Sequence, residues 1–217
     1  MKISNLLLPL LFVAVNAYDN YIPVPGSHVG LTYGGSDSGL KIELFYDLLC
    51  EISADYHPKI IELMNSDFLG KKVKDVVEIT FVFFPLPYHR GSWVVTKIVP
   101  YLVDLCHADA SKCHLYLDYI QFCFDNRNWI MYDLSNSDDD LTNIWTGTVA
   151  SRLRLNKDDL LLLFDRSKDT HDSEMRTREL FKYSAHRSVG STPTSMLNGA
   201  IIQGAPSTAR AWLKLLT

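Results

Sequence analysis

The chain has 217 residues, of which 47% are hydrophobic and 21% are charged, and its formal net charge is −4. This composition is that of an ordinary globular protein, and the length is enough to bury one good core. A slightly acidic chain offers no basic surface to a phosphate backbone, so we expect no nucleic-acid partner.

The first 17 residues have the pattern of a secretory signal peptide. Lys2 precedes an apolar run from Leu6 to Val15, and Val15-Asn16-Ala17 is typical of a cleavage site before Tyr18. The alternative is a membrane anchor, but the run is shorter than the roughly 20 apolar residues that span a bilayer. We therefore expect residues 18–217 to form an exported chain without a membrane span. The C-terminus carries no lumenal retention signal, which favours secretion over the endoplasmic reticulum lumen.

Residues 18–39 are rich in glycine and proline and predict an irregular lead-in. Within it, a short strand is expected from His28 to Tyr33. Gly34-Gly35 would then turn this strand into a hairpin with the next one, residues 40–46. Such a hairpin would place the first strand at the edge of a sheet.

An apolar strand, residues 40–46, leads into Cys50, and an amphipathic helix is expected from Cys50 to Met64. The helix positions expected to face the core are Ile52, Tyr56, Ile60, Leu63 and Met64. Pro58 inside the helix predicts a kink. A thiol at a helix N-terminus is favoured as thiolate, because unpaired N–H groups and the helix dipole stabilise an anion. Cys50 is therefore a candidate nucleophile, and the alternative is a buried structural cysteine.

The segment Val76 to Phe84 is apolar on both faces, which is typical of a central strand covered on two sides. His89 and Arg90 follow at its carboxyl end, the end at which ligands bind in open α/β sheets. We expect these two residues to tune the Cys50 thiolate if the fold brings them near it. The alternative is a solvated loop.

From Ser92 to about Arg187 the pattern is helical, with Asp138-Asp139-Asp140 charging the start of one helix and Asn156 and Asp172 opening two others. The expected helices are Trp93–Cys106, Leu115–Phe124, 141–153, Lys157–Ser167 and one ending near His186. Leu160–Phe164 also fits a strand, but its acidic flanks favour a helix. Asn198-Gly199 then predicts a β-hairpin with Ile201-Ile202 as its return strand. Ser207 is expected to cap a last amphipathic helix.

The four cysteines are Cys50, Cys106, Cys113 and Cys123, and in an exported chain they favour disulfides. Cys106 and Cys113 would lie about 10 Å apart on one continuous helix, too far for a bridge. A helix break in Ala108–Lys112 would permit it, and Cys113–Cys123 is the other option. A third alternative is that Cys50 pairs with a cysteine of this region.

Three separated stretches together resemble the DsbA-like branch of the thioredoxin superfamily, in particular its eukaryotic secreted or lumenal members. They are Leu44–Ser53, Phe84–His89 and Val189–Gly199, in the order that the family has them. The resemblance covers residues from about 40 to 216. It departs from the family at one point: the Cys-x-x-Cys motif reads Cys50-Glu-Ile-Ser53 here.

The resemblance implies an α/β thioredoxin fold with a helical insertion. Residues 18–217 would form one domain, with thioredoxin halves at about 28–90 and 172–217 and an insertion at about 92–171. It also implies that Pro193 is cis and faces Cys50, with Thr192 and Pro193 shaping a substrate groove. Ser53 takes the place of the resolving cysteine, where its hydroxyl could bond the thiolate but cannot form a disulfide.

We therefore expect a monothiol thiol–disulfide oxidoreductase or isomerase in which Cys50 forms mixed disulfides and Ser53 assists. Its partners would be cysteine-containing or extended polypeptides, and glutathione. The alternative is a non-catalytic module that binds proteins or peptides and has lost redox turnover. The scattered histidines show no metal-ligand spacing, and we expect neither a metal nor another cofactor.

Overall fold

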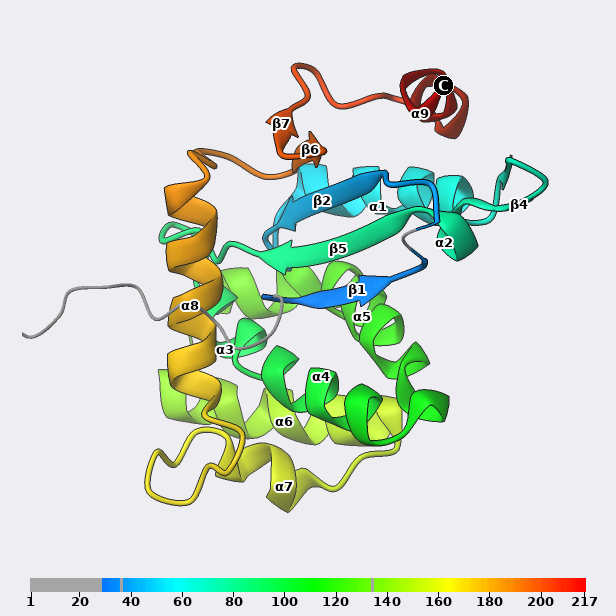
Figure 1. Ribbon diagram of the computed structural model, residues 1–217. Helices are drawn as coiled ribbons and strands as arrows, with labels where there is room; N and C mark the ends of the chain where they lie inside the picture. The colour runs from blue at the N-terminus through cyan, green and yellow to red at the C-terminus, as the bar shows by residue number, and fades with distance from the viewer. Residues whose placement is uncertain (1–28, 36, 134) are drawn as a thin grey trace, which may run out of the picture.

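The structure, a computed structural model, describes residues 29–35, 37–133 and 135–217. A five-stranded sheet with the order β1-β5-β2-β6-β7 forms its centre (Figure 1). The strands are β1 (Leu31–Tyr33), β2 (Lys41–Tyr46), β5 (Glu78–Phe83), β6 (Thr194–Leu197) and β7 (Ala200–Ile201). β2 and β5 are parallel, and the other neighbouring pairs are antiparallel. The predicted signal peptide and His28 lie outside the described residues.

The helices of the described chain surround this sheet. In chain order they are α1 (Glu51–Met64), α2 (Val73–Val76), α3 (Ser92–Thr96), α4 (Val99–Ala108), the 3₁₀ helix η1 (Ala110–Lys112), α5 (His114–Tyr132), α6 (Asp138–Leu153), α7 (Lys157–Leu162), α8 (Ser173–His186) and α9 (Ala209–Leu216). A second, two-stranded sheet, β3 (Asp67–Phe68) and β4 (Lys71–Lys72), follows α1.

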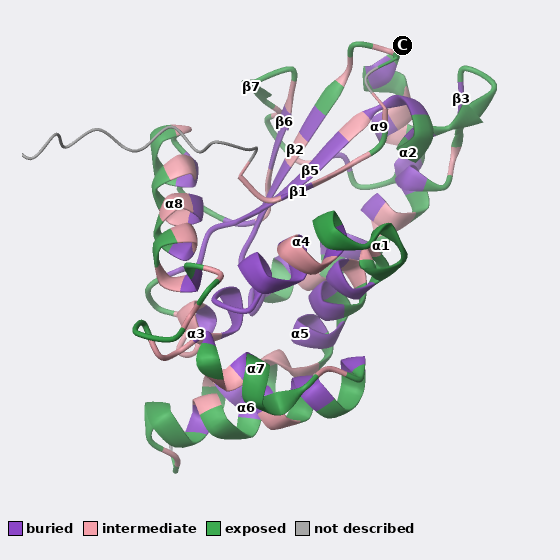
Figure 2. Cartoon of the chain, turned by 60° about the horizontal axis from the view of Figure 1, so that its bottom comes forward, coloured by how far each residue is buried: buried purple, intermediate pink, exposed green. Residues whose placement is uncertain are grey.

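The alternating side chains of β2 explain how helices cover both faces of the sheet. Phe45 stacks on Tyr183 of α8, whereas Tyr46 meets Tyr56 of α1 edge to face. Figure 1 shows α8 beside the strands, at the left of the view, and α1 behind β2. β2 and β5 are accordingly mostly buried, whereas β7 is exposed and α6 and α7 expose much of their outer surface (Figure 2). The expectation of a central, doubly covered strand is confirmed for β5, which lies between β1 and β2.

The predicted hairpin between the first two strands is wrong, although β1 does lie at the edge of the sheet. β1 pairs with β5 instead, with Leu31 opposite Phe81. The glycines around β1 allow this close approach: a Cβ on Gly30 would overlap the Phe81 carbonyl oxygen, and one on Gly34 would overlap that of Val77. These two glycines therefore serve close backbone contact as well as turning.

Proline explains a second correction, in the segment predicted as one helix from Trp93 to Cys106. The chain forms two helices there, α3 and α4, and Pro100 lies in the first turn of α4. Proline has no backbone N–H, so it is accommodated where a helix begins and not in a helix interior.

Several helix ends also differ from the prediction. α5 continues to Tyr132, and α7 ends at Leu162 instead of Ser167. Ser137 caps α6 through a capping box with Asp140, and Thr208 caps α9 in place of Ser207. The Asn156 cap, the helical state of Leu160 and the Asn198-Gly199 hairpin are confirmed.

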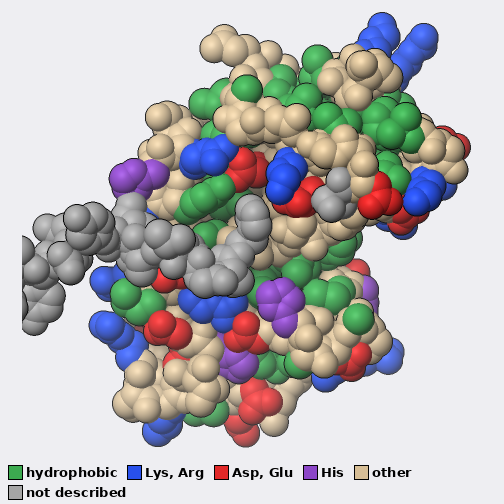
Figure 3. Space-filling model, in the orientation of Figure 1, with side chains coloured by type: hydrophobic (Ala, Val, Ile, Leu, Met, Phe, Trp, Pro, Cys, Tyr) green, Lys and Arg blue, Asp and Glu red, His purple; other side chains and the backbone are tan. Residues whose placement is uncertain are grey.

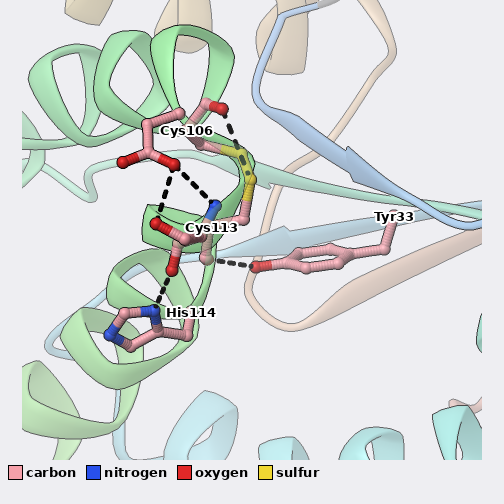
Figure 4. The surroundings of a disulfide bond; sticks show 6 residues. Tyr33, Cys106, Cys113 and His114 are labelled. Atoms are coloured by element: carbon pink, nitrogen blue, oxygen red, sulfur yellow. Dashed lines mark hydrogen bonds between the residues drawn. A yellow bond between two sulfur atoms is a disulfide. The ribbon is translucent and has the colours of Figure 1, made fainter.

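Cys106 and Cys113 form a disulfide, the first of the two alternatives left open by the sequence. The break between α4 and α5 brings their Cα atoms to 4.3 Å. The Tyr33 hydroxyl donates to the Cys113 carbonyl at 3.1 Å, so the bridge is tied to β1 (Figure 4). Cys50 and Cys123 are free thiols, and both are buried, so within the described residues Cys50 does not pair with a cysteine of this region.

Removing this disulfide should lower stability with little change in the fold. A loop of about eight residues predicts a loss of roughly 2–3 kcal/mol, because the unfolded chain regains loop entropy. The measurement is denaturant unfolding of the double variant Cys106→Ala/Cys113→Ala. Wild-type protein held reduced should share its midpoint, and unchanged midpoints in both samples would contradict the prediction.

Candidate functional site

Cys50 occupies the position expected of it, between the central strand β2 and helix α1. It is the N-cap residue of α1 and has extended backbone angles (φ −73°, ψ 123°). Its backbone N–H donates to the Asp47 carbonyl at 3.1 Å, which closes a tight turn after β2. Cys50 is 6% exposed, so only a small part of its surface reaches solvent.

The buried carboxylate of Asp47 holds the segments around this turn together. Its oxygens accept hydrogen bonds from the N–H of Leu49 at 2.7 Å, the N–H of Leu86 at 2.6 Å and the hydroxyl of Ser92 at 2.8 Å. His89 Nδ1 lies 3.1 Å from Asp47 Oδ2, within ion-pair distance but without hydrogen-bond geometry. Asp47 therefore fixes the loop before Cys50 against the loop after β5.

The Thr192–Pro193 peptide bond is cis, and it lies beside Cys50. The Cys50 thiol donates to the Thr192 carbonyl oxygen, with a distance of 3.4 Å from Sγ to O. Antiparallel pairing of β6 with β2, which places Thr194 opposite Phe45, brings this segment to the end of the sheet where Cys50 lies. Cys50, Thr192 and Pro193 are thus in one place, as the sequence predicted.

Ser53 is fully buried one helical turn after Cys50, and its hydroxyl has no hydrogen-bond partner among the described residues. The Thr192 hydroxyl, on the other side of Cys50, is buried and without a partner in the described chain as well. A protonated thiol can donate to the Thr192 carbonyl, whereas a thiolate can only accept. Because Cys50 is the N-cap residue of α1, the first-turn N–H groups of this helix are donors available to a Cys50 thiolate.

Arg90 and His89 are directed to other partners. The Arg90 guanidinium donates to the carbonyls of Asp133 and Asn136 and to the Asp138 carboxylate, in the connection from α5 to α6. His89 faces Asp47. The contacts of Arg90 place its charge on this connection and not on the thiol, so the structure does not bring Arg90 into the site.

Arg127 of α5 is a cation that the sequence did not single out. Its Nη2 lies 4.0 Å from a carboxylate oxygen of Glu51, the residue after Cys50, and its Nε is buried without a partner in the described chain. Ile52 was predicted to face the core, but its exposed fraction is 65%. Tyr88, in the loop after β5, has an exposed fraction of 70%. No local pattern marks Arg127, because only the packing of α5 against α1 brings it to Glu51.

His57 lies deeper on α1, inside a cage of aromatic rings. Tyr46, Phe81 and Phe124 surround it, with ring centroids 5.5 to 5.8 Å from its own. Burial lowers the pKa of His57 to about 4, because the charged imidazolium would lose its hydration. His57 is therefore neutral at physiological pH.

The residues that the structure describes contain no cluster of three or more side chains suited to a metal ion. None of their helices has both the length and the apolar character needed to cross a membrane. Acidic and basic side chains are interspersed on the face shown in Figure 3.

No protein-family model matches the sequence, and no curated protein matches it. Solved structures do match. A proposed protein-disulfide isomerase from Pseudomonas syringae superposes with a TM-score of 0.66 at 16% identity, covering 87% of this chain and 98% of that one. BdbD from Bacillus subtilis gives 0.58 at 16% identity over 85% and 89% of the two chains. DsbA from Chlamydia trachomatis gives 0.58 at 15% identity over 88% and 91%.

The fold is a DsbA-like thioredoxin fold with a helical insertion. Among its described residues, the segment from α3 to α7 contains helices and no strand. The expected fold class is therefore confirmed. These identities are too low to carry an activity over to this chain, so its function must be argued from its own residues.

Asp47→Ala should destabilise the fold by about 3 kcal/mol or more, because it leaves the donors on Leu49, Leu86 and Ser92 buried and unpaired. Denaturant unfolding measures this loss. Asp55→Ala, which removes an exposed carboxylate from α1, serves as the control and should change the midpoint little. Equal effects of the two substitutions would contradict the role given to Asp47.

His57 should make stability depend on pH. The pKa of His57 is about 4 in the folded state, against 6.5 as the ordinary value, so the unfolded chain binds a proton first as pH falls. This contribution is complete above pH 6.5 and is lost between pH 6.5 and 4, by roughly 3 kcal/mol. Unfolding free energies measured across this range should show the slope. His57→Leu should flatten it, and an unchanged slope in that variant would refute the assignment.

Proposed function

We propose that this chain is an exported thiol–disulfide exchange protein that acts through a single thiol, that of Cys50. The observation that carries the proposal is the contact between Cys50 Sγ and the Thr192 carbonyl at the cis Thr192–Pro193 bond. It supports the proposal because a thiol at a helix N-terminus is favoured as thiolate, and this thiol lies beside a backbone segment that another chain could pair with.

The segment before β6 suits an extended polypeptide. Pairing between β6 and β2 begins at Thr194, and the Thr192 N–H has no hydrogen bond in the described chain. An extended peptide could bond this backbone and bring its own sulfur to Cys50. Ile52, two residues after Cys50, and Tyr88, in the loop after β5, are both largely exposed and offer apolar surface to such a peptide.

The reaction begins with loss of the Cys50 proton to solvent and loss of the thiol's hydrogen bond to Thr192. The thiolate then attacks one sulfur of a substrate disulfide: a new bond forms from Cys50 Sγ to that sulfur, and the substrate S–S bond breaks. The electron pair leaves on the second substrate sulfur, which takes up a proton as a thiol. The product is a mixed disulfide at Cys50.

Ser53 decides how this mixed disulfide is resolved. A hydroxyl cannot attack the new bond to form an intramolecular disulfide, so release needs a thiol from outside the chain. A second cysteine of the substrate or glutathione supplies it, attacking the substrate sulfur and restoring Cys50. The free hydroxyls of Ser53 and Thr192 assist by donating to the sulfur of Cys50 when it carries negative charge.

The alternative is a binding module without redox turnover that keeps the groove beside Pro193. One observation favours it: Cys50 is only 6% exposed, which restricts access of a second sulfur to the thiol. The two functions differ in whether Cys50 reacts while the protein is folded.

Incubation with glutathione disulfide, followed by mass mapping of the folded protein, separates them. Thiol exchange predicts a glutathionyl adduct on Cys50 and none on Cys123, whose pKa burial raises well above its ordinary value. Cys50→Ala should form no adduct. Two results together would establish the binding module. Cys50 stays unmodified in the folded protein, and a reduced cysteine peptide binds equally well to wild type and to Cys50→Ala.

Restoring the second thiol provides a complementary experiment. In Ser53→Cys the introduced thiol should form an intramolecular disulfide with Cys50, and insulin reduction should rise by about tenfold or more over wild type when a dithiol reductant is supplied. Ser53→Ala, the matched control, should not raise it. If the introduced thiol does not pair with Cys50, the first turn of α1 does not have the expected geometry.

A further inference from the structure

Three buried polar atoms without a hydrogen-bond partner in the described chain lie on or against the inner side of α1. They are Tyr46 Oη, Ser53 Oγ and His57 Nδ1. Tyr46 and Ser53 have no exposed surface, and His57 is 2% exposed. Ser53 and His57 belong to α1, which begins directly after Cys50, and Tyr46 is the last residue of β2, the strand that α1 packs behind (Figure 1).

The geometry makes these groups neighbours. Ser53 and His57 are four residues apart on one helix, so their side chains lie on the same face, one turn from each other. The Tyr46 ring meets the His57 ring edge to face, with centroids 5.8 Å apart. From β5 and α5, Phe81 and Phe124 present only apolar rings to the imidazole.

Three separate unpaired groups in this position would be costly. A buried donor or acceptor without a partner costs about 1–3 kcal/mol, and native proteins leave few such groups. A neutral histidine has one donor and one acceptor nitrogen, and each of the two hydroxyls can donate and accept. The three groups together can satisfy a small polar molecule with two to four hydrogen bonds, as buried water requires.

We propose that Tyr46, Ser53 and His57 form an internal hydration site behind Cys50, in which Ser53 is the positioning residue that links the bound water to the thiol. Water bonded to His57 and Tyr46 would orient the Ser53 hydroxyl and hold its proton available to the Cys50 sulfur. The serine that stands in place of a second cysteine would then help to set the reactivity of Cys50. Only this link to the thiol rests on the proposed function; the hydration site itself does not.

A double-mutant cycle tests the hydration site without reference to activity. The variants are Ser53→Ala, His57→Leu and the double variant, each measured by denaturant unfolding. A shared water predicts coupling: the double variant should differ from the sum of the singles by at least about fivefold in the unfolding equilibrium constant. The cycle also cancels the higher helix propensity of alanine.

Thr177 provides the matched control, because its hydroxyl on α8 is also fully buried without a partner in the described chain. Thr177→Val combined with His57→Leu should be additive. Additivity in the Ser53–His57 cycle as well would overturn the hydration site, since the two side chains would then be unpaired independently of each other.

The link to the thiol is tested by the rate of Cys50 alkylation as a function of pH. Ser53→Ala and His57→Leu should both move the profile in the same direction, Ser53→Thr should restore it, and Thr177→Val should leave it in place. Coupling in the stability cycle together with an unmoved profile would show that Ser53 does not act on the thiol. The glutathione adduct on wild-type Cys50 reports on the proposed function separately, so failure of that function is distinguishable.

Discussion

The hydrogen bond from the Cys50 thiol to the Thr192 carbonyl joins two segments 142 residues apart, and the arrangement of the site depends on it. Strand pairing makes it possible: β2 delivers Cys50 to one end of the sheet, and antiparallel β6 brings Thr194 beside Phe45. The buried Asp47 carboxylate then fixes the turn between β2 and α1. Cys50 and the cis Thr192–Pro193 bond are therefore positioned by the central sheet.

The same contact can form only while Cys50 is protonated. A thiol can donate to the Thr192 carbonyl, whereas a thiolate must turn to donors, and the donors at hand are hydroxyls and the backbone of the first turn of α1. Arg127, a cation of α5, lies beside the opposing charge of Glu51. A serine at position 53 is consistent with such a site, because its buried hydroxyl is not used elsewhere in the described chain.

Much of this arrangement could be predicted from local sequence. The strand, cysteine and helix around Cys50 and the hairpin after Pro193 each carry their own periodicity and turn residues. The predictions that failed concern the pairing of β1, the partners of Arg90 and the exposure of Ile52, which depend on how the segments pack together. Gly30 and Gly34 resemble turn formers, but they also allow β1 to lie against β5. Arg90 follows the central strand, yet its donors are taken up between α5 and α6. Ile52 fits the apolar period of α1 but faces solvent, because the first turn lies at the open end of the sheet.

The central claim is that Cys50 and the Thr192–Pro193 segment form one site, and backbone amide NMR of the glutathionylated protein tests it most directly. An adduct at Cys50 should shift the amide resonances of Gly190, Ser191, Thr192 and Thr194 as strongly as those of the first turn of α1, and Cys50→Ala treated in the same way should show neither change. Shifts confined to α1, with these four resonances unmoved, would contradict the account.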